Sequence, residues 1–313
     1  MARRFSFAGV GYICCALVAC GVPDSATSAP LFVGSWDVCS SGGRPFGVAV
    51  DEAGDVYVTN QSAGTLEKFS RDGVLIARLA ESLNYPCGVT IATDGTIYVV
   101  EHLANQVRRL SPGGISLGTF GDDLFRPGFV AVDRDGFVYV TDFLNRVVKF
   151  TSDGARVTAW GSFGVGPGQL NDPAGVALAG DGTVFVVDHG NDRIERFTSS
   201  GVHVSTWGGP GPGDGEFRIP HGTAVDAGGN VYVADNGNAR MQVFSSEGGF
   251  LDKWGTAGAG PGQFGPDSPT DVAVDSRGEV FVVDRANCRV ERFADRPIRT
   301  VRRTWGSLKS AYR

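Results

Sequence analysis

The side chains best suited to acid–base or metal chemistry in this 313-residue chain are its histidines. There are four of them, at His102, His189, His203 and His221. Only His221 directly follows a proline that opens an apolar run. The matching positions elsewhere hold Phe46, Cys87, Gly128, Ala174 and Thr270. Because a catalytic zinc usually takes three protein ligands, we expect no metal and no other cofactor.

Nucleophilic catalysis has no clear motif here. The chain contains neither a Gly-x-Ser-x-Gly elbow nor a Cys-x-x-Cys pair. The segment Asp133-Arg134-Asp135-Gly136 superficially fits a calcium loop, but Leu144 stands where such a loop needs glutamate. We interpret that segment as a tight Asp-Gly turn.

Carboxylates and arginines recur at fixed places. Acidic or amide residues end one type of run, and arginine often follows a few residues later, as in Asp235 and Arg240. Such rows could bind phosphate or acidic groups, since guanidinium forks suit both. A catalytic centre, however, needs unlike residues converging at one place. The repetition therefore favours structural ion pairs.

Internal repetition organises the rest of the chain. Six apolar runs each follow a proline, at intervals of 41 to 49 residues. These prolines are Pro45, Pro86, Pro127, Pro173, Pro220 and Pro269. A period of this length is typical of propeller blades.

Each copy predicts four β-strands. The opening run leads through a turn such as Asp135-Gly136 into a second run such as Val138-Tyr139-Val140, which is the pattern of a hairpin. A third run ends in an aromatic residue or Leu, and a fourth usually ends in an aromatic residue followed by Gly, as in Trp160-Gly161. Such a sheet must stack on its neighbours around a ring. We therefore predict an all-β fold, a six-bladed β-propeller of four-stranded antiparallel blades.

The repeat resembles the NHL repeat over residues 31–306. The resemblance rests on Pro-x-Gly-Val-Ala-Val-Asp, Val-Tyr-Val-x-Asp and Asn-x-Arg-Val-x-x-Phe, and on linkers such as Pro261-Gly262-Gln263-Phe264. The amidating lyases that cleave peptidyl-α-hydroxyglycine are similar propellers whose zinc-binding histidines follow the strand-opening proline. His221 matches that position, but no other copy does. Gluconolactonase-like propellers use acidic and amide ligands for a divalent metal, and here the nearest carboxylate, Asp271, lies one residue away.

The N-terminus resembles a bacterial lipoprotein signal. Arg3 and Arg4 precede the short apolar segment Phe5–Ala19, and Leu17-Val18-Ala19-Cys20 resembles a lipobox. We expect a signal peptide over 1–19, a lipid on Cys20, a flexible tether over 20–30, the propeller over 31–306 and a tail over 307–313. The protein would then be exported and lipid-anchored to the bacterial cell envelope. An uncleaved anchor, or cleavage after Ala29, are the alternatives.

Three cysteines would remain in the folded part: Cys39, Cys87 and Cys288. They permit at most one disulfide, and the sequence leaves the pairing open. Two segments compete for the last strand position of the ring, Leu31–Trp36 and Ile298–Trp305. The link at Asp295-Arg296-Pro297 lacks the Gly of the other third turns, so we predict that the N-terminal segment closes the sixth blade.

Charge and composition narrow the function. A net charge of -6 and a pI near 5.3 argue against nucleic-acid binding, which usually needs a basic face. We expect a monomeric binding scaffold that recognises a protein, peptide or glycan, and not an enzyme. The alternative is a metal-dependent lyase or lactonase.

The candidate binding site lies where the loops vary. The connections from fourth to first strand and from second to third strand share one end of a propeller, and the former grow from about seven residues to about thirteen along the chain. Long loops on a rigid scaffold often carry recognition. The candidate residues open strands or lie in the second loops: Phe46, Cys87, His102, Phe129, His189, His221 and Thr270.

Overall fold

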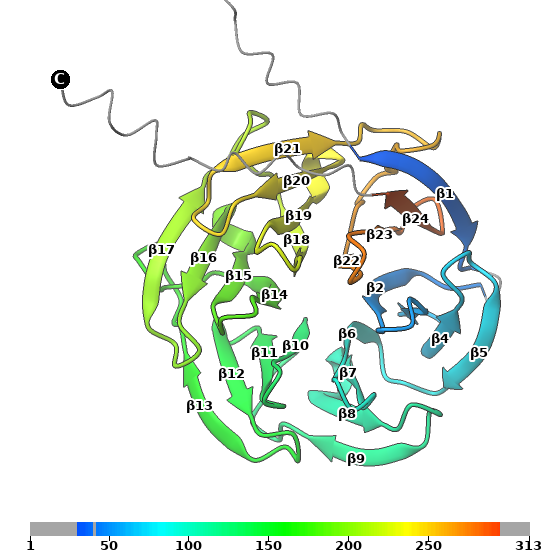
Figure 1. Ribbon diagram of the computed structural model, residues 1–313. Coiled ribbons are helices and arrows are strands. Elements are labelled where there is room, and N and C mark those ends of the chain that lie inside the picture. The colour runs from blue at the N-terminus through cyan, green and yellow to red at the C-terminus, as the bar shows by residue number, and fades with distance from the viewer. Residues whose placement is uncertain (1–29, 40–41, 295–313) are drawn as a thin grey trace, which may run out of the picture.

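The computed structural model describes residues 30–39 and 42–294. The proposed signal peptide, Cys20, most of the tether and the C-terminal tail lie outside the described residues. Within them, six four-stranded antiparallel sheets surround a central axis (Figure 1). This arrangement confirms the predicted six-bladed β-propeller.

The first three blades run in chain order from the inner to the outer strand. Blade 1 contains β2 (Pro45–Val50), β3 (Val56–Asn60), β4 (Thr65–Phe69) and β5 (Leu75–Ala80). Blade 2 contains β6 (Pro86–Ile91), β7 (Ile97–Glu101), β8 (Gln106–Leu110) and β9 (Ser116–Phe120). Blade 3 contains β10 (Val130–Val132), β11 (Val138–Asp142), β12 (Arg146–Phe150) and β13 (Arg156–Trp160).

The last three blades continue the ring. Blade 4 contains β14 (Pro173–Leu178), β15 (Val184–Asp188), β16 (Arg193–Phe197) and β17 (His203–Gly208). Blade 5 contains β18 (Pro220–Val225), β19 (Val231–Asp235), β20 (Arg240–Phe244) and β21 (Phe250–Trp254). Blade 6 contains β22 (Val272–Val274), β23 (Val280–Asp284), β24 (Arg289–Ala294) and, as its outer strand, β1 (Leu31–Asp37).

Helical structure in the described residues is confined to short 3-10 turns after three of the second strands. They are η1 (His102–Ala104), η2 (His189–Asn191) and η3 (Asn236–Asn238). Over the ranges 30–39 and 42–294, no helix has the length and apolarity needed to cross a membrane.

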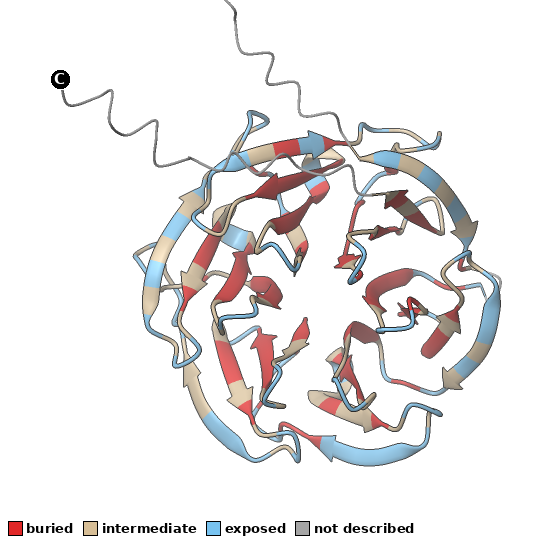
Figure 2. Cartoon of the chain, viewed as in Figure 1, coloured by how far each residue is buried: buried red, intermediate tan, exposed pale blue. Residues whose placement is uncertain are grey.

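Burial follows the position of each strand in its blade. Every residue of the second strands is buried, from β3 to β23, whereas the outer strands are largely exposed or half-buried (Figure 2). Val, Tyr and Phe dominate the second strands, and these residue types fit a pleated, packed surface. The blades therefore bury their centres against one another and leave the outer rim to solvent.

Glycines of the third turns pack on aromatic rings of the preceding blade. Gly248 has φ +84°, and an added Cβ would lie 2.7 Å from Cδ2 of Trp207. Gly201 meets Trp160 in the same way, and Gly154 meets Phe120. The recurring Trp-Gly and third-turn Gly of the sequence are thus two halves of one contact between blades.

The N-terminal strand closes the ring, as predicted. Strand β1 pairs antiparallel with β24, with Leu31 opposite Ala294 and Asp37 opposite Arg289. The competing segment 298–305 lies outside the described residues. Just beyond the end of β1, a disulfide joins Cys39 to Cys288, 249 residues apart in sequence. This pair answers the question that the cysteine count left open, and Cys87 stays free and buried.

The repeated carboxylate–arginine pairs hold the long loops. Asp235 is fully buried and accepts from Nε of Arg240 at 2.7 Å and from the backbone N–H of Arg218 at 2.8 Å. Arg240 also donates to the carbonyls of Pro212, Gly213 and Glu216. Blades 4 and 6 repeat the arrangement through Arg193 and Arg289. The structural interpretation of these rows is confirmed.

The two ends of the ring differ. One end, which we call the loop face, carries the connections from fourth to first strand and from second to third strand. The other end, the turn face, carries the tight glycine turns. Because β1 starts opposite the end of β24, the described chain both enters and leaves the propeller on the turn face.

Candidate functional site

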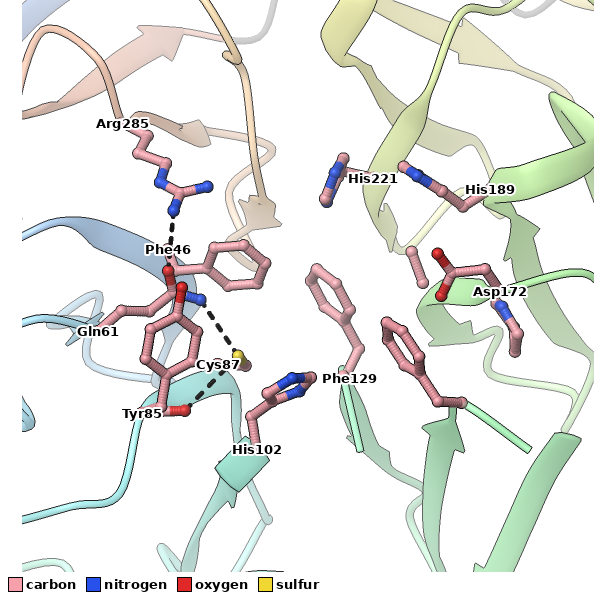
Figure 3. Close-up of a pocket in the computed structure, with 14 residues that line it drawn as sticks. Phe46, Gln61, Tyr85, Cys87, His102, Phe129, Asp172, His189, His221 and Arg285 are labelled. Atoms are coloured by element: carbon pink, nitrogen blue, oxygen red, sulfur yellow. Dashed lines mark hydrogen bonds between the residues drawn. The ribbon is translucent and has the colours of Figure 1, made fainter. Parts of the chain in front are cut away.

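A pocket of about 200 Å³ opens on the loop face around the central axis (Figure 3). All six blades contribute to its walls. The lining residues are Phe46, Gln61, Tyr85, Cys87, His102, Gly128, Phe129, Phe143, Asp172, Pro173, Ala174, His189, His221 and Arg285.

Three positions of the repeat supply most of this wall. One directly precedes the strand-opening proline, as Tyr85 and Asp172 do. One directly follows that proline, as Phe46 and His221 do. The third follows the last residue of the second strand, as His102 does. Equivalent places in a uniform scaffold thus present aromatic, acidic, basic, amide and thiol groups to one space.

The pocket brings together most of the residues proposed from the sequence. Phe46, Cys87, His102, Phe129, His189 and His221 all line it. Thr270 is not among the lining residues. Its side chain is fully buried, and its hydroxyl donates to the carbonyl of Phe46 at 3.0 Å.

Sequence reasoning missed the other side chains of this wall, among them Gln61, Tyr85, Phe143, Asp172 and Arg285. A positional signal for them existed. Gln61, Phe143 and Arg285 are the counterparts of His102 and His189 at the end of the second strand, while Tyr85 and Asp172 precede the opening proline. Comparing these two positions in all copies would have found them.

Aromatic rings form one side of the pocket. The rings of Phe46 and Phe129 have their centroids 5.6 Å apart, and that of His221 lies 6.0 Å from Phe46 in an edge-on arrangement. Phe129 also lines a cavity of about 210 Å³ further along the axis. Phe129 therefore lies at the boundary between the loop-face pocket and the rest of the central channel.

Two histidines are fixed by the backbone of the next blade. Nδ1 of His102 lies 3.0 Å from the carbonyl oxygen of Pro127, and Nδ1 of His189 lies 2.9 Å from that of Pro220. A carbonyl can only accept, so each Nδ1 carries the hydrogen. In the neutral ring Nε2 then keeps its lone pair, ready to accept a proton or a hydrogen bond.

His221 is held neutral. Its pKa falls to about 3, first because of burial and then because of His189 and Arg285. Its Nδ1 is buried and has no hydrogen-bond partner among the described residues. A buried polar atom without a partner costs about 1–3 kcal/mol, and such atoms often mark functional places.

Cys87 does not behave as a nucleophile. Burial raises the pKa of its thiol to about 12, and the thiolate is the reactive form of cysteine. Its Sγ accepts a hydrogen bond from Nε2 of Gln61 at 3.2 Å. Cys87 therefore forms part of the wall.

Two charged side chains enter the pocket from opposite sides (Figure 3). Arg285 donates from Nη2 to Oε1 of Gln61 at 3.1 Å, and its guanidinium lies 5.6 Å from the centre of the Phe46 ring. Burial lowers the pKa of Arg285, and the nearby Arg44 adds to that effect. Burial raises the pKa of Asp172, while His189 and His102 act in the opposite direction.

Metal ligation has no ready cluster in the described part of the chain. No group of three or more His, Cys, Asp or Glu side chains is placed there to hold a metal ion.

Comparisons with known proteins agree with this architecture. The NHL repeat family matches residues 217–244 and 267–293, which fall in blades 5 and 6. No curated protein sequence matches the chain.

Solved structures resemble it at low sequence identity. A virginiamycin B lyase from Staphylococcus aureus has a TM-score of 0.60 at 18% identity, covering 84% of this chain and 88% of that one. A streptogramin B lyase has a TM-score of 0.60 at 14% identity, covering 83% and 96%. A gluconolactonase from Xanthomonas campestris has a TM-score of 0.62 at 18% identity, covering 81% and 86%. At these identities the likeness establishes the fold and leaves the activity open. This chain is a six-bladed β-propeller, and its blades 5 and 6 match the NHL repeat.

Proposed function

We propose that the protein is a recognition module that binds its ligand in the loop-face pocket. The observation that carries this proposal is the convergence of unlike side chains from all six blades on one space. A repeated scaffold does not need such variety for its own packing. Binding sites, in contrast, combine apolar walls with a few placed polar groups.

The size of the pocket limits what enters it. A volume of about 200 Å³ equals about seven waters at about 30 Å³ each. Pockets for drug-sized ligands measure about 300–1,000 Å³. The pocket therefore suits a small molecule, or one ring or side chain of a larger peptide, protein or glycan.

An apolar rim supports contact beyond the pocket. Large exposed side chains gather in the loops of blades 2 to 4 on this face: Leu103, Phe125, Phe143, Leu144, Phe163 and Val165. Phe143 belongs to both the rim and the pocket wall. A larger ligand that inserts one group would cover part of this rim.

Fragment screening tests the proposal. Small aromatic fragments should shift the NMR signals of pocket residues, and Phe143→Ala should weaken their binding because Phe143 is accessible, at 42% exposed. Phe163→Ala is the matched control, since Phe163 is 70% exposed and lies outside the pocket. Signals that move only on the turn face, or equal binding by both variants, would contradict it. Phe46 is a poorer choice because it is buried and its loss also costs stability.

A second candidate is an enzyme that transfers a proton. His102 and His189 have Nδ1 bonded to a carbonyl, and Nε2 of each has no hydrogen-bond partner among the described residues, which suits a general base. Lyases and gluconolactonases share the fold. Turnover of a streptogramin B or of an aldonolactone that is lost in His189→Gln would support this candidate. Metal analysis of the purified protein tests the metal-dependent version of this enzyme candidate, because that version requires a stoichiometric divalent ion.

Lipid anchoring of the exported protein completes the proposal. The lipobox-like Leu17-Val18-Ala19-Cys20 supports acylation of Cys20, and two or more acyl chains anchor a protein stably. A tether at residues 20–30 would reach the ring on the turn face, so the pocket would point away from the membrane. Cys20→Ser should abolish fatty-acid labelling, and labelling that persists would contradict the anchor.

A further inference from the structure

We infer that the loop-face pocket takes a dipolar aromatic group, with its anionic end at Arg285 and its cationic end at Asp172. This inference rests on the proposed function, that the pocket binds a ligand, and adds the chemical class of that ligand. It follows from the charges, the aromatic wall and the unpaired groups of the pocket.

The two charged side chains of the wall have no ion-pair partner among the described residues. Neither Arg285 nor Asp172 takes part in a salt bridge there, although both are half-buried. The buried aspartates of blades 3 to 6 show the opposite pattern, because each faces an arginine, as Asp188 faces Arg193 at 2.7 Å. Charges that leave water are normally paired, and here only more distant charges act on them, Asp267 on Arg285 and His189 on Asp172.

Three other titratable groups of the wall, His102, His221 and Cys87, do not supply the partner charges. His102 and His221 are neutral at pH 7, since burial lowers the pKa of both rings. The thiol of Cys87 stays protonated because burial raises its pKa to about 12. The pocket thus presents one positive end and one negative end.

The positive end is shaped for an oxyanion. Arg285 is held by the Gln61 side chain at 3.1 Å and by Tyr85, and its Nε is buried without a partner among the described residues. Arg44 adds a second positive charge nearby, and Asp267 adds a negative one. A planar guanidinium with free N–H groups recognises carboxylates through two parallel hydrogen bonds.

The negative end is a free carboxylate. Asp172 makes no side-chain hydrogen bond with the described residues, and His189 and His102 are the groups that act on its charge. Its backbone φ of +50° belongs to the repeat, because Tyr85 and Ile219, which also precede a strand-opening proline, have φ +55° and +50°. An ammonium or another strong donor would supply the missing partner.

Aromatic rings line the wall between the two ends (Figure 3). Phe46 and Phe129 are tilted by 41° with centroids 5.6 Å apart, and His221 stands edge-on both to Phe46 and to His189. Aromatic groups prefer offset or edge-on contacts at such separations. The volume of about 200 Å³ admits a single ring with two short substituents.

Four probes test the inference on the full-length protein. They are 4-(aminomethyl)benzoate, benzoate, benzylamine and benzyl alcohol, each titrated by ligand-detected NMR. The dipolar probe should bind about 10- to 100-fold more tightly than benzoate or benzylamine, as expected when one charge-assisted hydrogen bond of about 1.5–3 kcal/mol is added.

Variants assign each end. Asp172→Asn should remove the advantage of the dipolar probe over benzoate, and Arg285→Gln should remove its advantage over benzylamine. Arg44→Gln is the control, because Arg44 is exposed and should change affinity by only about two- to threefold. Unchanged thermal unfolding of both pocket variants excludes misfolding as the cause.

The outcomes separate this inference from the proposed function. Equal binding of all four probes in the pocket would overturn the dipolar ligand and leave ring recognition in place. An advantage of the dipolar probe that persists in Asp172→Asn would also overturn it. If no probe binds the pocket, the proposed function fails together with the inference.

Discussion

The imidazole of His221 lies edge-on to that of His189, with 4.8 Å between the ring centroids and an angle of 80° between the planes. His189 is fixed by its bond to the carbonyl of Pro220, the residue directly before His221. The two rings therefore form one unit at the junction of blades 4 and 5. Protonating His221 in this setting is unfavourable, which gives the first prediction.

Acidic pH should destabilise the protein through His221. The pKa of this ring is about 3 in the folded protein, against 6.5 for an unperturbed histidine of the unfolded chain. Between these values the unfolded chain binds more protons, so this contribution is present in full above about pH 6.5 and is lost as the pH falls. The contribution of His221 to the free energy of unfolding changes by at most about 1.4 kcal/mol per pH unit. The free energies of unfolding of the wild type and of His221→Gln, measured in urea, should therefore converge as the pH drops from 7 to 4, or cross so that the variant becomes the more stable protein. A constant difference between the two over this pH range would contradict the prediction.

Reducing the disulfide should loosen the closure of the ring. Cys39–Cys288 spans 249 residues, and removal of a native disulfide typically costs about 2–5 kcal/mol. We expect Cys39→Ser with Cys288→Ser to lower the free energy of unfolding by this amount in denaturant titrations. Added dithiothreitol should destabilise the wild type and leave the double variant unchanged. A reductant effect of equal size on both would mean that the bond is not the cause.

Replacing a third-turn glycine should separate backbone strain from packing. Gly248 and Gly136 both have φ +84°, so alanine strains both in the same way. At Gly248 the new Cβ would meet Trp207 at 2.7 Å, whereas at Gly136 the nearest atom is Cβ of Ser152 at 3.5 Å. Gly248→Ala should cost about 1–3 kcal/mol more than Gly136→Ala. Equal losses in thermal unfolding would show that the Trp207 contact is not tight.

Removing Arg240 should free the loop before blade 5. Arg240→Met leaves Asp235 buried without its partner, which typically costs about 3–5 kcal/mol, and releases the carbonyls of Pro212, Gly213 and Glu216. Hydrogen exchange should rise across residues 209–219. The control is Glu247→Ala, because Glu247 pairs with Arg196 but is 75% exposed, so its loss should cost at most about 1 kcal/mol. Comparable costs for the two variants would argue against the proposed support of the loop.

The fold was predictable because it repeats. Six copies of one strand pattern determine one blade each, and the missing glycine after Ala294 indicated that Leu31–Trp36 completes the sixth. The disulfide follows from that register: once Asp37 pairs with Arg289, Cys39 and Cys288 lie side by side. Sequence spacing alone could not reveal the pair, since the two cysteines come from opposite ends of the folded chain.

The site was harder to predict because its residues carry no motif. His221 and Phe46 stood out because each follows one of the recurring prolines, but the positions of Asp172 and Arg285 hold different residues from copy to copy. Thr270 occupies the same repeat position as His221, yet its hydroxyl turns into the contact between blades 6 and 1. Which way such a side chain turns depends on the local course of the strand, and β22 begins only at Val272.

Strand β1 has a consequence for how the ring is connected. Leu31 lies opposite Ala294, so the two ends of the described chain are as close as the strands of the hairpins in the other blades. A short Ser-x-x-Gly turn could join them, and the chain could be cut instead at the third turn of another blade, for example at Gly113-Gly114. Such a circular permutant would keep all six blades and would move the place where strands from the two ends of the chain meet to another blade. The order of the blades in the gene would then be a matter of where synthesis starts, and not of how the ring is built.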